Sequence, residues 1–176
     1  RRNIWRVLVG CQITTQQRSG PESNVAQFLR SKSAALNYAI CRDAPSVRTL
    51  VRKECQKAGL RMAPKIAMNL SAILEFLEDG EWKELRRQLA TIAGRTTRRK
   101  ERLVVRYLIS SKYPGLGQKQ SRNFIQWLGL SRYEIPIDSR ILKTLREFRS
   151  NLAPKGAALT DESVYEFVEE GLQQIA

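Results

Sequence analysis

The chain has 176 residues, of which 42% are apolar, which suits one compact domain or two small lobes that share a core. It carries 31 Lys and Arg against 17 Asp and Glu, a formal net charge of +14, with three cysteines and no histidine. The lack of histidine excludes histidine-based triads and a histidine-ligated catalytic zinc. The cysteines form no zinc or iron–sulfur pattern, which favours buried thiols in a reducing compartment, and no apolar run is long enough to cross a bilayer.

The positive charge is unevenly distributed. Residues 151–176 contain one lysine against five acidic residues, a net charge of −4, which leaves +18 in residues 1–150. A folded body with this excess is typical of proteins that bind a polyanion, and we expect nucleic acid as the partner. A solvated basic surface is one alternative. An anionic membrane is another, although the basic residues do not follow one amphipathic helix.

Helical periodicity predicts an all-α fold. Residues 4–9 (IWRVLV) are compatible with a helix or a strand. Apolar residues at helical spacing then predict helices at 25–36 (opened by Ser-Gly-Pro at 19–21), 47–51, 66–77 (ended by Glu-Asp-Gly at 78–80), 82–89, 103–108, 124–128 (closed by Gly129), 141–148 and 164–172. Residues 150–160 are expected to form a loop before the acidic last helix.

The turn Pro114-Gly115-Leu116-Gly117 lies between two predicted helices. Its glycines permit positive φ and a close approach to the backbone, and Leu116 is expected to anchor the turn to the core. The following helix starts near Gln118, and its first N–H groups have no intrahelical partner, so we expect a site for a DNA phosphate. An ordinary turn is the alternative, because Gly-x-Gly before a helix is common.

Lys119 falls in the first turn of this helix, where the helix dipole disfavours a cation. A neutral amine there can form a Schiff base, whereas an isolated surface lysine is the simpler interpretation. Asp138 is expected at the N-cap of the next helix. The chain returns through a turn near 129–134 and brings Asp138 back towards Lys119, which favours a functional pair.

These residues resemble a known signature. "YPGLGQKQSRNFIQWLG" (113–129) and "IPIDSRIL" (135–142) are similar to the helix-hairpin-helix motif of the HhH-GPD DNA glycosylases, the superfamily of endonuclease III and the 8-oxoguanine glycosylases. "GLRMAPKIAMNLSAILEFL" (59–77) resembles the Gly-Leu-x-x-x-Lys-Ala helix of that family. "VLVGCQITTQQRS" (7–19) resembles its early helix, which ends in a glutamine-bearing loop at the gap left by a flipped base.

The resemblance implies a two-lobed all-α HhH-GPD unit over 1–176. Lobe one spans about 20–130, with the helix-hairpin-helix at 103–129. Lobe two combines 1–19 with 131–176, and the active-site cleft lies between the lobes. Arg140 replaces the histidine that follows the aspartate in the family, and the four-cysteine iron–sulfur loop is missing. Bifunctional members vary at the position of Arg140, and the missing cluster argues against a close relative of endonuclease III. The long basic helix before the turn, "RTTRRKERLVVRYLISSKY" (95–113), resembles the compact, cluster-free 8-oxoguanine branch.

The resemblance also implies a function. We expect a monomeric, bifunctional DNA glycosylase and AP lyase of base excision repair, without cofactor or metal, in the nucleus or the bacterial cytoplasm. Its partner is double-stranded DNA with a damaged base, 8-oxoguanine being the expected lesion. The expected catalytic residues are Lys119 and Asp138, and the expected DNA contacts are Gly115, Leu116, Gly117, Gln118, Gln16, Gln17 and Arg140.

Other interpretations remain open at the level of sequence. The chain can be a non-catalytic helix-hairpin-helix DNA-binding module, a glycosylase for an oxidised pyrimidine, or a basic RNA-binding or scaffold protein. A monofunctional glycosylase gives no reason for Lys119. The basic run at 95–102 is expected to contact the DNA backbone or to be a solvated helix start. The helical spacing of Tyr107, Phe124 and Trp127 predicts that they lie in the core, and stacking on a base is the alternative.

Overall fold

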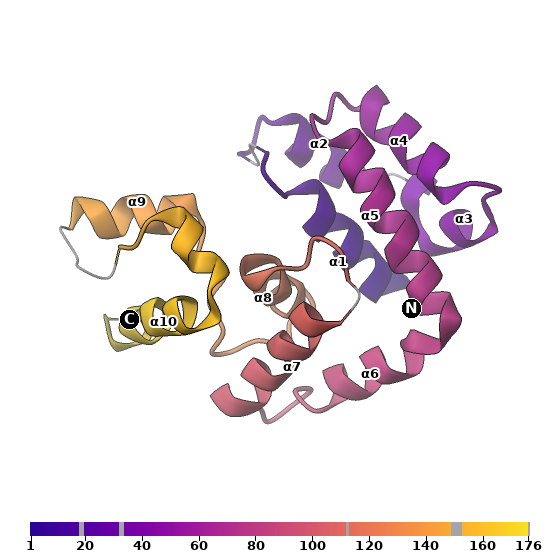
Figure 1. Ribbon diagram of the computed structural model, residues 1–176. Helices are drawn as coiled ribbons and strands as arrows, with labels where there is room; N and C mark the ends of the chain where they lie inside the picture. The colour runs from indigo at the N-terminus through magenta and orange to yellow at the C-terminus, as the bar shows by residue number, and fades with distance from the viewer. Residues whose placement is uncertain (18–19, 32–33, 112, 149–152, 176) are drawn as a thin grey trace. The chain divides into compact units, whose positions relative to one another are not determined.

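The structure is all-α. The computed structural model describes residues 1–17, 20–31, 34–111, 113–148 and 153–175, which form helices and contain no strand (Figure 1). The all-α prediction is therefore confirmed. The ambiguous residues 4–9 lie inside helix α1 (Arg2–Ile13), where Trp5, Leu8 and Val9 are buried at helical spacing. No helix among the described residues is long and apolar enough to cross a membrane.

The chain divides into two compact units. Unit 1 comprises Arg1–Gln88 with Ser111–Gly115, and unit 2 comprises Leu89–Ser110 with Leu116–Ala176. The boundary therefore falls near residue 89 and again inside the glycine turn. The lobes implied by the resemblance, 20–130 and 1–19 with 131–176, follow different ranges and stay a prediction.

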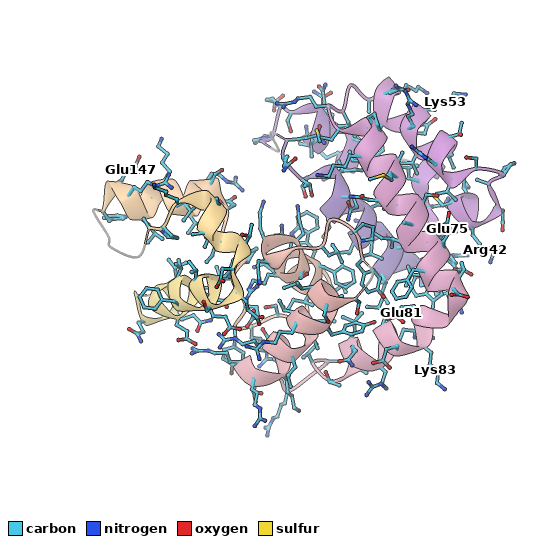
Figure 2. The ribbon with its side chains drawn as sticks, in the orientation of Figure 1. Arg42, Lys53, Glu75, Glu81, Lys83 and Glu147 are labelled. Atoms are coloured by element: carbon cyan, nitrogen blue, oxygen red, sulfur yellow. The ribbon has the colours of Figure 1, made fainter. Side chains whose placement is uncertain are left out.

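Unit 1 is built around α5. It contains α1, α2 (Asn24–Arg30), η1 (Ala34–Leu36), α3 (Tyr38–Asp43), α4 (Val47–Lys57), α5 (Ala63–Phe76), η2 (Leu77–Glu81) and most of α6 (Trp82–Ala90). Helix α4 packs along α5, and α1 also contacts α5 (Figure 1). Exposed charged side chains, among them Lys53 and Lys83, point away from this core (Figure 2).

The helix predicted over 25–36 is shorter than expected. The Ser23 side chain accepts a hydrogen bond from Ala26 N–H at 3.1 Å and caps α2, so the helix begins after Pro21 and not at it. Helix α2 ends at Arg30, and Leu36 belongs to the separate turn η1. The predicted end of the 66–77 helix is confirmed, because Gly80 breaks the helical path at φ +108°.

Unit 2 contains the helices of the predicted hairpin. They are α7 (Arg98–Ser110) and α8 (Gln118–Trp127), followed by α9 (Ser139–Glu147), η3 (Gly156–Thr160) and α10 (Glu162–Ile175). Helices α7 and α8 pack against each other. A small apolar cluster joins the start of α9 to α10 and includes Ile137, Leu142, Leu145, Tyr165 and Val168. The expected loop at 150–160 is in part η3, and residues 149–152 lie outside the described ranges.

The acidic last helix has a structural partner in α7. Arg102 pairs with Glu166 at 3.2 Å and with Glu170 at 3.1 Å. Arg106, one turn later, pairs with Glu162 and Glu166. The sign asymmetry of the sequence is thus partly neutralised inside unit 2. Arg98, Arg99 and Lys100 at the start of α7 stay exposed, and no ion pair involves them within the described part of the chain.

Candidate functional site

The glycine turn is held by a buried pair of amides. Gln12 Nε2 donates to the carbonyl of Pro114 at 2.8 Å, and Asn69 Nδ2 donates to Gln12 Oε1 at 2.8 Å. Gly115 lies against this pair with φ +82°, and an added Cβ would stand 2.6 Å from Gln12 Oε1. Gly115 is therefore required for both its backbone conformation and its lack of a side chain.

Gly117 differs from Gly115. Its φ is −81°, which any residue adopts, and an added Cβ would meet no atom within 4 Å. It is the N-cap of α8 and provides no side chain to cap the helix. Leu116 between the two glycines is buried, as expected. Gly117 is exposed, and the first N–H groups of α8 have no intrahelical partner, which suits an anion such as a DNA phosphate.

Lys119 is the second residue of α8, as the sequence predicts, and its side chain is half-buried. No hydrogen bond or ion pair involves its ammonium group within the described part of the chain. An amine at this position is available for chemistry with an external molecule.

Asp138 is the N-cap of α9, which confirms the predicted capping role. Its carboxylate accepts hydrogen bonds from Arg140 N–H at 2.9 Å and from Ile141 N–H at 3.0 Å. The Arg140 side chain, which is 81% exposed, also donates to it through Nε at 2.9 Å. Burial raises the pKa of the Asp138 carboxyl, but the hydrogen bonds from Ile141 and Arg140 outweigh it and hold the pKa below its ordinary value.

The structure thus gives Asp138 a different partner from the one expected. The Arg140 side chain binds Oδ2, the N–H groups of Arg140 and Ile141 bind Oδ1, and no hydrogen bond or ion pair joins Asp138 to Lys119 in the described residues. Both residues lie in unit 2. The roles predicted for Lys119, Asp138 and Arg140 in DNA chemistry stay predictions.

The two glutamines expected near a flipped base have different environments. Gln17 is used within unit 1: Nε2 donates to Ile13 O at 2.8 Å, and Oε1 accepts from Arg61 N–H at 2.8 Å. Gln16 is exposed and adopts φ +55°, the left-handed conformation that is uncommon outside glycine. Gln16 is therefore the glutamine that is presented to solvent. Residues 18 and 19, which end the motif at 7–19, lie outside the described ranges.

Gln118, an expected DNA contact, has its side chain directed into the protein. Its Oε1 accepts from Arg122 Nη1 at 2.8 Å, and the side chain is buried. A contact from Gln118 to an outside molecule is therefore left to its backbone N–H.

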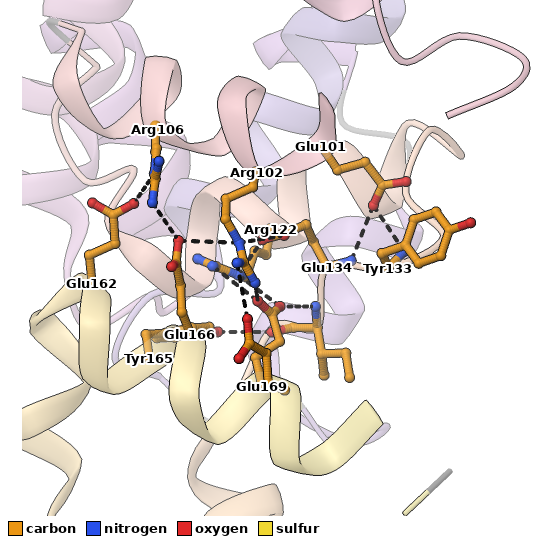
Figure 3. A network of polar contacts seen from close by, with 12 residues as sticks. Glu101, Arg102, Arg106, Arg122, Tyr133, Glu134, Glu162, Tyr165, Glu166 and Glu169 are labelled. Carbon is orange, nitrogen blue, oxygen red and sulfur yellow. Dashed lines mark hydrogen bonds and ion pairs between the residues drawn. The ribbon is translucent and has the colours of Figure 1, made fainter. Parts of the chain in front are cut away.

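Sequence reasoning missed the buried charges behind α8. Arg122 is 1% exposed and lies 2.8 Å from Glu134 and 3.0 Å from Glu169, both with fully buried carboxylates (Figure 3). Burial, opposed in part by Arg122, raises the pKa of the Glu134 carboxyl to about 7. The signal in the sequence is slight: a glutamate in the otherwise apolar stretch "EIPI" and an arginine one turn after Lys119.

The aromatic residues divide between core and surface. Phe124 is fully buried, as predicted, but Trp127 is 43% exposed, so the core prediction for Trp127 is wrong. Trp127 is the last residue of α8, where the helix turns away at Gly129 with φ +73°. Tyr107 is half-buried.

The described residues contain no group of histidine, cysteine and carboxylate side chains that could hold a metal ion. Cys11, Cys41 and Cys55 are buried and form no disulfide within the described residues. Burial raises the pKa of the Cys41 thiol to about 11 and that of the Cys55 thiol to about 12, so neither thiol is a ready nucleophile.

The chain was compared with known proteins. No protein-family model matches it, and searches of the curated proteins and of the solved structures found no match either. The observations that bear on function are therefore the geometry above and the sequence motifs.

Proposed function

We propose that the chain is a bifunctional DNA glycosylase and AP lyase of the HhH-GPD type, which excises an oxidised base from duplex DNA in base excision repair. The proposal rests on the arrangement of residues at the start of α8. There an unpaired lysine follows Gly117, where an added Cβ would meet no atom within 4 Å, and an aspartate whose pKa is lowered lies in the same unit.

The turn and α8 account for DNA binding. Backbone N–H groups after Gly117 bind a phosphate, and the helix dipole adds to the attraction. The exposed Arg98, Arg99 and Lys100 lie at the end of α7 that is remote from the turn, and they add positive charge that attracts DNA, so the affinity falls as the salt concentration rises. The damaged nucleotide leaves the base stack, since C1′ is not accessible inside a duplex. Gln16, exposed on its turn, is suited to the vacated space.

The lysine carries out the chemistry. Lys119 Nζ attacks C1′, the bond between C1′ and the base breaks, and the base leaves with the bonding electron pair. Opening of the sugar gives a Schiff base between Nζ and C1′. Loss of a proton from C2′ then expels the 3′ phosphate by β-elimination, which nicks the strand. Asp138, ionised at neutral pH, stabilises the positive charge that develops on the sugar. We infer that 8-oxoguanine is the preferred lesion.

A second candidate function is a non-catalytic helix-hairpin-helix DNA-binding module. The bonding of Asp138 favours it, because Arg140 and the start of α9 satisfy this carboxylate without Lys119. Such a module needs the turn and the basic surface but has no use for a reactive amine.

Borohydride trapping separates the two functions. The protein is incubated with duplexes that carry 8-oxoguanine, an oxidised pyrimidine or an abasic site, and the covalent adduct is measured for the parent, Lys119→Gln and Lys143→Gln. Lys143 is an exposed lysine on α9 of the same unit and serves as the matched control. We expect the parent and Lys143→Gln to form the adduct, fastest on 8-oxoguanine or the abasic site, and Lys119→Gln to form none.

Tight binding of every duplex by the parent without any adduct would contradict the lyase and support the DNA-binding module. An adduct that persists in Lys119→Gln would assign the chemistry to another amine.

A further inference from the structure

The irregular segment 131–137, which leads directly into Asp138, is held by side chains and not by secondary structure. The Glu101 carboxylate on α7 accepts hydrogen bonds from the N–H groups of Tyr133 at 2.9 Å and Glu134 at 3.1 Å (Figure 3). It also accepts from the N–H group of Arg132 at 2.9 Å. Glu101 is fully buried although it lies within a basic stretch of sequence. One carboxylate thus fixes three successive backbone groups.

Helix α10 holds the second half of the segment. The Tyr165 hydroxyl donates to Ile135 O at 3.0 Å and accepts from Ile137 N–H at 2.6 Å. Glu169 Oε1 accepts from Ile135 N–H at 2.5 Å. Ile137, which is bonded to Tyr165, directly precedes Asp138, the cap of α9. The bond between Ile137 and Tyr165 therefore limits where the Asp138 carboxylate can lie.

Arg122 connects the same groups to the helix that carries Lys119. Its guanidinium lies over the Tyr165 ring at 4.0 Å and donates to both oxygens of Glu169, at 3.0 and 3.3 Å. It also donates to Gln118 Oε1 in the first turn of α8. Arg122 follows Lys119 by three residues, so the two project from neighbouring turns of α8.

Buried charges of this kind are poor stabilisers, because removing them from water costs about as much as their attraction returns. Their best-attested use is to fix one geometry among several. Here the geometry that they fix is that of segment 131–137 relative to the first turns of α8.

We propose that Tyr165, together with Glu101, Arg122 and Glu169, is a positioning set that places the Asp138 carboxylate relative to the start of α8. This inference rests on the proposed function. None of the four is a catalytic residue: they act on the reaction only through Asp138. Their contribution is therefore to the rate of the chemical step and not to DNA affinity.

Tyr165→Phe tests this proposal, with Tyr133→Phe as the matched control. The phenylalanine keeps the ring under Arg122 and removes only the hydroxyl that bridges Ile135 and Ile137. Tyr133 lies in the same segment with an exposed ring. Three quantities are measured: the single-turnover rate of adduct formation on an 8-oxoguanine duplex, the Kd for that duplex, and amide hydrogen exchange at residues 137–141.

We expect Tyr165→Phe to lower the single-turnover rate by about 10- to 100-fold, because small displacements of a catalytic group have effects of this size. Its Kd should stay within about 2-fold of the parent's, a change in binding free energy smaller than that of one ordinary hydrogen bond. Amide exchange at residues 137–141 should become faster. Tyr133→Phe should match the parent in all three.

A parent-like rate in a folded Tyr165→Phe would overturn the positioning proposal and leave the proposed function intact. If Tyr165→Phe does not fold, Glu101→Gln, which keeps the side-chain volume, is judged by the same three measurements. A parent protein that forms no adduct overturns the proposed function, and the positioning proposal with it. The two failures are thus distinguished by whether the parent is active.

Discussion

The two helix starts of unit 2 are built in opposite ways. Helix α8 begins after Gly117, which has no side chain and no atom within 4 Å of an added Cβ. Helix α9 begins at Asp138, whose carboxylate bonds to the N–H groups of Arg140 and Ile141. Both ends carry the partial positive charge of a helix N-terminus. The N-terminus of α8 can therefore accept an anion from another molecule, whereas the N-terminus of α9 is already bonded to the Asp138 carboxylate.

Among the variants that keep Lys119, Asp138→Asn is expected to have the largest effect on activity, because it removes the charge at the start of α9 and keeps the cap. The lyase rate should fall about 100-fold or more, as when a group that stabilises transition-state charge is lost. Asparagine caps helices about as well as aspartate, so the free energy of unfolding at pH 7 should change by less than about 1 kcal/mol. Single-turnover trapping and urea unfolding measure the two quantities.

Asp161→Asn is the control for Asp138→Asn. Asp161 precedes α10 and accepts from Ser163 N–H and Val164 N–H in the same manner as Asp138 does at α9. It should keep the parent's lyase rate. Equal rates for Asp138→Asn and the parent would mean that Asp138 acts only as the N-cap of α9 and has no role in the reaction.

Glu134→Gln tests a second difference between the two helix starts: a buried carboxylate, Glu134, precedes α9, and none precedes α8. The effect of this carboxylate is measured as a change of stability with pH. The pKa of Glu134 is raised to about 7, so between its unfolded pKa and pH 7 the folded chain holds a proton that the unfolded chain has lost. This contribution to stability is present at low pH and is lost as the pH rises through 7. Between pH 5 and pH 8 the parent should lose about 2 to 3 kcal/mol that Glu134→Gln does not lose.

Urea unfolding of both proteins at pH 5 and pH 8 gives this difference directly. A stability difference between parent and Glu134→Gln that is the same at both pH values would contradict the raised pKa.

Substitution of each glycine of the turn by alanine distinguishes an effect on stability, expected at Gly115, from an effect on DNA binding, expected at Gly117. These are the smallest of the expected effects. Gly115→Ala should cost about 2 kcal/mol or more of stability, because φ is positive and Gln12 leaves no room. Gly117→Ala should change stability by less than about 0.5 kcal/mol. Its methyl group should weaken duplex binding about 5-fold, roughly 1 kcal/mol.

Thermal unfolding and fluorescence anisotropy with a labelled duplex measure these effects. Unchanged DNA affinity in Gly117→Ala would mean that no phosphate approaches the start of α8.

Several features of the site could be predicted from the sequence alone because they depend on residues within one helical turn. The start of α8 at Gln118, the glycine at 129 that closes it after Trp127 and the cap of α9 by Asp138 are of this kind. Each follows from a glycine or a short polar side chain next to an amphipathic run. The helix predicted over 25–36 starts close to the expected place, with Ser23 as its cap, but it ends at Arg30, and Leu36 belongs to η1.

The remaining features were decided only by tertiary structure, because they join residues far apart in the chain. Gln12 reaches Pro114 across 102 positions, and Glu101 reaches Arg132 across 31. Nothing local marks Gln12, Glu101 or Tyr165 as the partner of a distant backbone group, since a buried polar side chain looks like a surface one in sequence. The sequence alone thus determined which residues begin and end the helices around Lys119 and Asp138. Packing decided which side chains hold them, because buried backbone groups must find hydrogen-bond partners wherever the fold supplies them.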